Sequence, residues 1–310
     1  MRLLKIDEAG IVMALAALVA GLSFASPDFL AADNLLTVAR QFSVYGIMAV
    51  GMTYVIVAGE IDLSVGSVLA LTGCLAAKLV VEHGWALPLA SSLAVATGAV
   101  VGALNGMLTV ALGIPSFIIT LGMMSVIRGL TYVMTSAMPI GGLPEEFRTL
   151  GYGTVGGVPL PVVLMGVVAL AGGVGLSRSQ FGRHVYATGG NLEAARLSGV
   201  PVHAVRIEVF AILGALAGLA GVLNAAWVTV AQPVAGLGYE LDVIAAVIIG
   251  GASFAGGHGS VLGTMLGATL MGVLRNGLIL LGVTVYWQQV AIGGVIVLAV
   301  MMDRVRRTPA

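Results

Sequence analysis

"QFSVYGIMAVGMTYVIVAGEIDLSVGSVLALTGCLAAKLVV", residues 41–81, holds two long apolar runs separated by a short segment with two carboxylates, Glu60 and Asp62. Each run approaches the length of about 20 apolar residues that a helix needs to cross a bilayer. Such runs are apolar on every side, whereas the strands of a membrane β-barrel alternate apolar and polar residues. The stretch therefore predicts transmembrane helices, and it raises the question of why two carboxylates lie between them.

The composition of the whole chain indicates that its solvent is lipid. Of its 310 residues, 59% are hydrophobic and only 9% are charged, against about 25% charged residues in a soluble domain. There are 45 glycines, where average usage predicts about 22, and small residues let membrane helices approach closely. We therefore expect an all-α, tightly packed bundle in membrane lipid. The net charge of +0 gives no general attraction to nucleic acid.

Glycines, prolines and charge clusters divide the chain into ten predicted spans and leave no separate soluble domain, so that residues 1–310 form one transmembrane domain. The predicted spans are residues 10–25, 41–58, 64–81, 87–111, 116–136, 160–176, 205–230, 241–254, 260–281 and 286–302.

The lysines and arginines of the short loops predict the orientation, because such residues concentrate on the cytoplasmic side. With the N-terminus inside, nine of them are cytoplasmic: Arg2, Lys5, Arg178, Arg183, Arg196, Arg206, Arg304, Arg306 and Arg307. Three are on the outer side: Arg40, Lys78 and Arg148. Both termini are therefore expected to be cytoplasmic. An alternative is a signal peptide cleaved before Ser26, although Asp7 and Glu8 do not suit its basic first region.

Two pairs of segments recur in the same order along the chain. "EIDL" at 60–63 precedes the third span and "ELDV" at 240–243 precedes the eighth, while "ALNGMLTVALGI" at 103–114 resembles "VLRNGLILLGV" at 273–283. In the predicted topology the third span starts inside and the eighth starts outside. Spans two to five and seven to ten therefore form a predicted inverted repeat, a common architecture of transporters.

The acidic residues of the first pair have two interpretations. Glu60, Asp62, Glu240 and Asp242 are expected at helix N-termini, where free amide groups and the helix dipole stabilise negative charge. They either only cap these helices or also line a polar pathway, because ionisable groups at membrane depth usually face a cavity.

Two arginines within the predicted spans extend this candidate pathway. Arg275 is expected about 22 Å along the ninth span, where it either pairs with Glu240 or Asp242 or extends to the outer headgroups. Arg128, in the fifth span, is expected to face the bundle interior and either to bind backbone carbonyls or to line the path. The remaining pathway candidates are the two asparagines of the second repeated pair, Asn105 and Asn276.

The segment after the sixth span, residues 177–206, is the longest cytoplasmic loop and contains the signals of a short helix. Asn191 is its predicted N-cap, Glu193 and Arg196 lie in its first and last turns, and Gly199 and Pro201 lie beyond its end. A short helix alone is marginal in water. It is therefore expected to pack on this protein's own surface or against another subunit.

The eighth span is short and ends in "IIGGASFAGGHGS", residues 248–260. Short, glycine-interrupted segments are typical of the moving or binding part of a transporter.

Several catalytic motifs are absent from the sequence. A G-x-x-x-x-G-K-[ST] loop needs a lysine on the phosphates, and the only lysines, Lys5 and Lys78, lie in no such loop. Zinc-ligand spacing and a Ser/His/Asp signature are also missing. The single cysteine, Cys74, lies in an apolar run and is expected to serve packing. We therefore expect no enzymatic activity, metal or cofactor in this chain.

Five segments between about residue 34 and residue 303 carry a family resemblance: "NLLTVARQFSVYGIMAVGMTYVIVAGEIDLSVGSVLALTG", "TLGMMSVIRGLTYV", "GRHVYATGGNLEAARLSGV", "AQPVAGLGYELDVIAAVIIGGASFAGG" and "NGLILLGV". In this order they resemble the membrane permease subunits of bacterial ABC sugar importers, of the ribose-permease type. In ribose permeases a small residue stands where this chain has Glu60, beside the shared Asp62, which leaves the identity of the sugar open.

The resemblance implies a bacterial inner-membrane complex. Two permeases, either identical or similar, would bind two ATP-hydrolysing subunits, and a periplasmic binding protein would deliver a monosaccharide. The resemblance also implies that the short helix of residues 177–206 is the coupling helix, which enters a cleft on the ATPase. Its candidate residues are Gly189, Gly190, Asn191, Glu193, Ala194, Ala195, Arg196, Leu197, Ser198 and Gly199.

The alternative function is a secondary transporter coupled to an ion gradient. Such a protein would need a carboxylate or histidine relay near the middle of the membrane, whereas the candidates here are expected at helix ends.

Overall fold

The computed structural model describes the backbone of residues 6–307 and the side chains of residues 9–295, 297, 298 and 301. Within residues 6–307 the chain forms thirteen helices and two very short strands, which confirms the all-α fold class. The elements are α1 (Ile6–Ala25), α2 (Ala32–Val57), α3 (Val65–Val81), α4 (Leu87–Leu112), α5 (Ser116–Thr135), α6 (Glu145–Tyr152), β1 (Thr154–Val155), β2 (Val158–Pro159), α7 (Leu160–Arg178), α8 (Gln180–Gly190), α9 (Leu192–Leu197), α10 (Val202–Val228), α11 (Tyr239–Ile249), α12 (Val261–Leu280) and α13 (Val285–Arg307). The strands β1 and β2 pair antiparallel, with Thr154 opposite Pro159.

Each of the ten predicted spans coincides with a helix, but fewer of these helices have the length and hydropathy to cross a membrane. Within the part of the chain that the structure describes, six meet that criterion: α2, α4, α5, α7, α10 and α12. In contrast, α11 has 11 residues, which at 1.5 Å per residue is about half of a hydrocarbon core of about 30 Å. The chain is therefore a multi-pass membrane protein, and ten complete crossings are not established by the helix lengths.

Two helices were not expected from the sequence. α6 lies between the fifth and sixth predicted spans, and α8 occupies the first part of the loop that was expected to hold only one short helix. The hydroxyl of Ser179 accepts a hydrogen bond from the backbone N–H of Gly182 and so caps the start of α8. This capping signal is present in the sequence, but Ser179 directly follows Arg178, the last residue of α7.

The core surrounds α2 and α10. In the most apolar 18-residue stretch of these two helices, 56% and 72% of the residues are buried, whereas α4, α5 and α7 turn most of their apolar side chains outward. Glycines allow the central helices to approach closely. A Cβ atom on Gly98 or on Gly102 of α4 would collide with the carbonyl oxygen of Gly214 or Phe210 of α10. Cys74 is buried among these helices, in agreement with its expected packing role.

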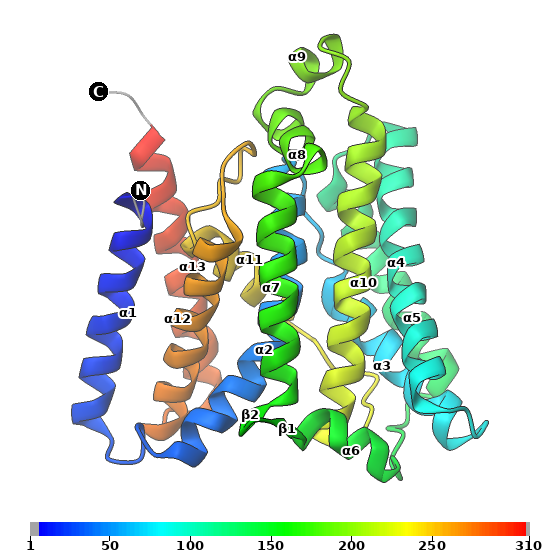
Figure 1. Ribbon diagram of the computed structural model, residues 1–310, viewed down its shortest axis with the longest axis vertical. Coiled ribbons are helices and arrows are strands. Elements are labelled where there is room, and N and C mark those ends of the chain that lie inside the picture. The colour runs from blue at the N-terminus through cyan, green and yellow to red at the C-terminus, as the bar shows by residue number, and fades with distance from the viewer. Residues whose placement is uncertain (1–5, 308–310) are drawn as a thin grey trace.

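The two ends of the bundle carry different elements. Figure 1 shows α8 and α9 at one end, together with the start of α1 and the end of α13, and α6 with the strands at the other. We call these the α9 end and the α6 end. Arg183 and Arg196, which were predicted to be cytoplasmic, lie on α8 and α9 at one end of the bundle. Arg148, which was predicted to be on the outer side, lies on α6 at the other end.

Part of the predicted orientation signal lies outside the described residues. Arg2 and Lys5 precede them, and the side chains of Asp7, Glu8, Arg304, Arg306 and Arg307 are likewise not described. α1 packs on α12, where Leu22 touches Gly277, and cleavage before Ser26 stays a prediction.

The segment between α11 and α12 meets the end of α2. The backbone N–H of Gly257, in the segment that follows α11, donates a hydrogen bond to the carbonyl oxygen of Val57, the last residue of α2.

Candidate functional site

Glu60 forms an ion pair that the sequence did not indicate. Its carboxylate accepts a hydrogen bond from the guanidinium of Arg206, in the first turns of α10, and both side chains are mostly buried. α3 begins only at Val65, with no acidic residue in its first turn. The expectation that Glu60 is stabilised by the N-terminus of α3 is therefore wrong, because its charge is neutralised by an arginine 146 residues away.

Asp62 shapes the turn that leads into α3. Its Oδ1 atom accepts hydrogen bonds of 2.7 Å from both the backbone N–H and the hydroxyl of Ser64. The side-chain amide of Asn105, on α4, donates to the Ser64 hydroxyl at 2.9 Å. Because Asp62 is only 2% exposed, this arrangement favours the capping interpretation over a side chain that lines a pathway.

We expect Asp62→Ala to destabilise the protein more than Asp62→Asn. Alanine leaves both donors of Ser64 without their acceptor, a loss of about 1–2 kcal/mol for a capping side chain. Asparagine keeps an oxygen in the same place. Thermal unfolding of the purified protein in detergent measures the difference, and equal melting temperatures for the two variants would contradict the capping role.

The starts of α3 and α11 meet inside the bundle. A Cβ atom on Gly66, in the first turn of α3, would collide with the carbonyl oxygen of Gly236, and it would lie 2.8 Å from Oε2 of Glu240. Glu240 and Asp242 lie in the first turn of α11, as expected. The two acidic segments of the predicted repeat therefore hold different positions, one before its helix and one inside it.

Arg128 fastens the segment before α11 to α5. Its guanidinium donates hydrogen bonds of 2.8 Å and 2.7 Å to the carbonyl oxygens of Pro233 and Ala235. Of the two expectations for this residue, the structure bears out binding to backbone carbonyls. The same helix holds the segment before α3, since the hydroxyls of Ser116 and Thr120 accept hydrogen bonds from the amides of Ile61 and Leu63.

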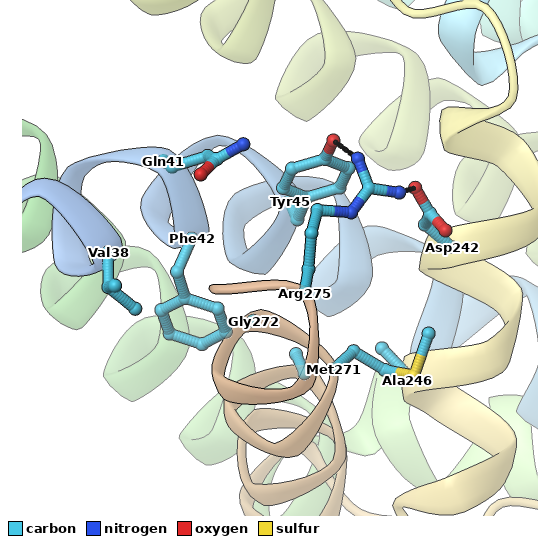
Figure 2. Close-up of a pocket in the computed structure, with 10 residues that line it drawn as sticks. Val38, Gln41, Phe42, Tyr45, Asp242, Ala246, Met271, Gly272 and Arg275 are labelled. Carbon is cyan, nitrogen blue, oxygen red and sulfur yellow. Dashed lines mark hydrogen bonds and ion pairs between the residues drawn. The ribbon is translucent and has the colours of Figure 1, made fainter. Parts of the chain in front are cut away.

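Arg275, on α12, connects three helices. Its guanidinium lies 2.7 Å from Oδ2 of Asp242 on α11 and donates to the hydroxyl of Tyr45 on α2 at 3.1 Å, as Figure 2 shows. The predicted ion pair is thus confirmed with Asp242, not Glu240, and extension to the headgroups is wrong. The sequence carries no local signal for Tyr45, which is 230 residues from Arg275.

A pocket opens beside this ion pair. Its polar side is formed by Gln41, Tyr45, Asp242 and Arg275 (Figure 2). The rest of its lining is apolar or small: Val38, Phe42, Ala246, Ala268, Met271 and Gly272. Asn276 does not line it, because its amide exchanges hydrogen bonds with Asn34, at the start of α2.

α9 has the ends that its sequence predicted. Asn191 caps it by accepting a hydrogen bond from the N–H of Ala194, Glu193 pairs with Arg196, and Gly199 follows with a φ of +82°. Gly189 and Gly190, which were grouped with this helix, instead form the last two residues of α8.

α9 exposes two apolar side chains at the end of the bundle. Ala195 is its one buried residue, whereas Leu192 and Leu197 are 46% and 79% exposed. Two leucines on a six-residue helix therefore face away from the chain. Among the described residues, no group of three His, Cys, Asp or Glu side chains is placed to hold a metal ion.

Long apolar helices packed around α2 and α10 are those of a multi-pass membrane protein. Residues 34–300 match the family described as branched-chain amino acid transport system / permease component, and the chain belongs to this permease family.

Relatives of known name cover nearly the whole chain. The ribose import permease protein RbsC of Escherichia coli (strain K12) is 47% identical over 296 residues, which are 94% of this chain and 92% of that protein. RbsC of Bacillus subtilis (strain 168) is 42% identical over 96% of this chain and 93% of its own length. The D-allose transport system permease protein AlsC of Escherichia coli (strain K12) is 39% identical over 96% and 92%. The resemblance to ribose-type permeases is confirmed, and no solved structure matches the chain.

Proposed function

We propose that this protein is the membrane permease subunit of a bacterial ATP-binding-cassette importer for a monosaccharide. The observation that carries the proposal is its 39–47% identity, over nearly its whole length, to permeases named for ribose and D-allose. The substrate crosses through this chain, and separate subunits hydrolyse the ATP, so that the permease itself needs no cofactor.

We propose that the ATPase docks on α9. The support is the exposure of Leu192 and Leu197 on a helix that has one buried residue. Covering these leucines removes apolar surface from water, which drives association. The helix itself is held in shape by its Asn191 cap and by its Glu193–Arg196 pair.

The same arrangement supports an orientation in the inner membrane. We propose that the α9 end is cytoplasmic, with both chain termini, because α8 and α9 carry Arg183 and Arg196. The periplasmic sugar-binding protein then meets the α6 end, and a second permease, either a copy or a similar chain, completes the membrane part.

We propose ten spans, with spans two to five and seven to ten related as an inverted repeat. The support is the contact between the starts of α3 and α11 at Gly66 and Gly236, and the recurrence of the acidic segments 60–63 and 240–243 near the starts of these two helices. In such architectures, discontinuous helices meet near the middle of the membrane, where the substrate passes.

Sugar uptake into proteoliposomes tests the proposed function. The permease is reconstituted with the ATPase and binding protein encoded beside it, and uptake of labelled pentoses and hexoses is followed. We expect uptake of a monosaccharide only with internal ATP and external binding protein, unchanged by a protonophore. Uptake driven by a proton or sodium gradient without ATP would identify a secondary transporter instead.

A further inference from the structure

Three segments of backbone meet near the α9 end without side chains between them. They are the end of α2 at Val57 and Gly59, the end of α8 at Gly189, and the segment between α11 and α12 at Gly256 and Gly257. We call these five residues the glycine junction. The candidate coupling residues, 189–199, therefore contact the core through the end of α8 and reach the surface through α9.

Gly189 has no room for a side chain. A Cβ atom there would collide with the carbonyl oxygen of Val57 and lie 2.7 Å from the backbone nitrogen of Gly257. These two groups are hydrogen-bonded to each other at 2.8 Å. The next residue, Gly190, has open space around the equivalent position, so the tight contact belongs to one face of α8.

Tyr186 adds a second connection from α8 to the same segment. Its hydroxyl donates a hydrogen bond of 2.7 Å to the carbonyl oxygen of Gly259. Burial raises the pKa of the Tyr186 phenol above its ordinary value, so the hydroxyl stays protonated and keeps donating at physiological pH. Gly259 directly precedes Ser260, which caps α12 by accepting from the N–H of Gly263.

The segment held by α8 joins α11 to α12, and these two helices contact each other at two levels. A Cβ atom on Gly267 of α12 would collide with the carbonyl oxygen of Ala246 of α11. Closer to the start of α11, Asp242 and Arg275 form the ion pair of Figure 2. Packed and paired elements of this kind move as a unit, because close-packed interiors do not deform continuously.

We infer that the glycine junction transmits movement of α9 to the α11–α12 hairpin, so that Gly189 and Tyr186 are positioning residues that couple ATP hydrolysis to opening at the Asp242–Arg275 pair. The inference rests on the proposed function. The proposed route lies inside this chain. It runs from the ATPase contact on α9 through α8 to α11 and α12, which line the pocket of Figure 2.

The test compares transport with hydrolysis in the reconstituted complex. Gly189→Ala separates α8 from Val57 and Gly257, and we expect the number of sugars moved per ATP to fall at least tenfold while ATP is still hydrolysed. Gly166→Ala is the matched control, since Gly166 lies in the preceding helix α7 with open space around it. We expect the control to keep the wild-type ratio.

If Gly189→Ala does not assemble with the ATPase, Tyr186→Phe tests whether the glycine junction couples hydrolysis to transport. It removes one hydrogen bond and adds no atoms to the junction, and we expect a fall of about two- to tenfold in sugars per ATP. A wild-type ratio in Tyr186→Phe and in any assembled Gly189→Ala overturns the inference. Absence of ATP-driven sugar uptake by the wild-type complex overturns the proposed function instead.

Discussion

Leu197→Asp is expected to prevent stable association of the ATPase with the permease. Leu197 is 79% exposed at the end of α9, and burying a leucine contributes about 1.5–3 kcal/mol. An aspartate at this position also brings an unpaired charge into the contact. We therefore expect association to weaken by about 100-fold or more, with loss of sugar uptake.

Co-purification and the concentration dependence of binding measure this effect. Val155→Asp is the control, because Val155 is exposed in β1 at the opposite end of the bundle (Figure 1). It should leave ATPase association unchanged. Arg196→Ala should have a smaller effect than Leu197→Asp, because the exposed Glu193–Arg196 pair contributes little by itself. Normal association of the Leu197→Asp variant with the ATPase would show that the contact does not lie on α9.

Arg275→Glu is expected to cause the largest loss of stability among single substitutions near the pocket. The change leaves Asp242 without its partner and opposes it with a second negative charge, in a site where the two side chains are 28% and 12% exposed. Removing one partner of a buried ion pair costs about 3–5 kcal/mol. We expect much less folded protein in the membrane and little uptake.

A charge exchange tests whether the partner is Asp242. Adding Asp242→Arg to Arg275→Glu restores opposite charges, so part of the stability and uptake should return. Adding Glu240→Arg should not rescue, because Arg275 is paired with Asp242 instead. Arg148→Glu is the control for a charge reversal in an exposed pair, where we expect a change within about 0.5 kcal/mol. Equal rescue by both second substitutions would contradict the observed pairing.

Helix positions and the ends of α9 were predictable because their signals are local. Hydropathy placed a helix at each predicted span, including α11, although its length leaves the number of complete crossings open. Asn191, Glu193 and Gly199 mark the ends of α9 through their own backbone neighbours. α8 was missed because its cap, Ser179, directly follows the last residue of α7 and the residues after it were interpreted as part of a loop.

Side-chain partners across helices were predictable only in part. Helical rise placed Arg275 near the start of α11, but it did not distinguish Glu240 from Asp242 or reveal Tyr45. Glu60 was assigned to a helix N-terminus, whereas it pairs with Arg206. The difference arises because Arg206 is 146 residues from Glu60 in the chain, so that the pair forms only when α10 packs beside the turn before α3.

The sequence by itself determined that this chain is an all-helical membrane protein of the ribose-permease type with a capped short helix within residues 191–199. Hydropathy, capping and motif order depend on residues that are near one another in the chain, and no tertiary contact is needed to establish them. Only the tertiary structure decided that Glu60 meets Arg206, that Arg275 meets Asp242 and Tyr45, and that Gly189 touches Val57. These contacts depend on how each helix is rotated and displaced against its neighbours, which close packing of the whole bundle sets.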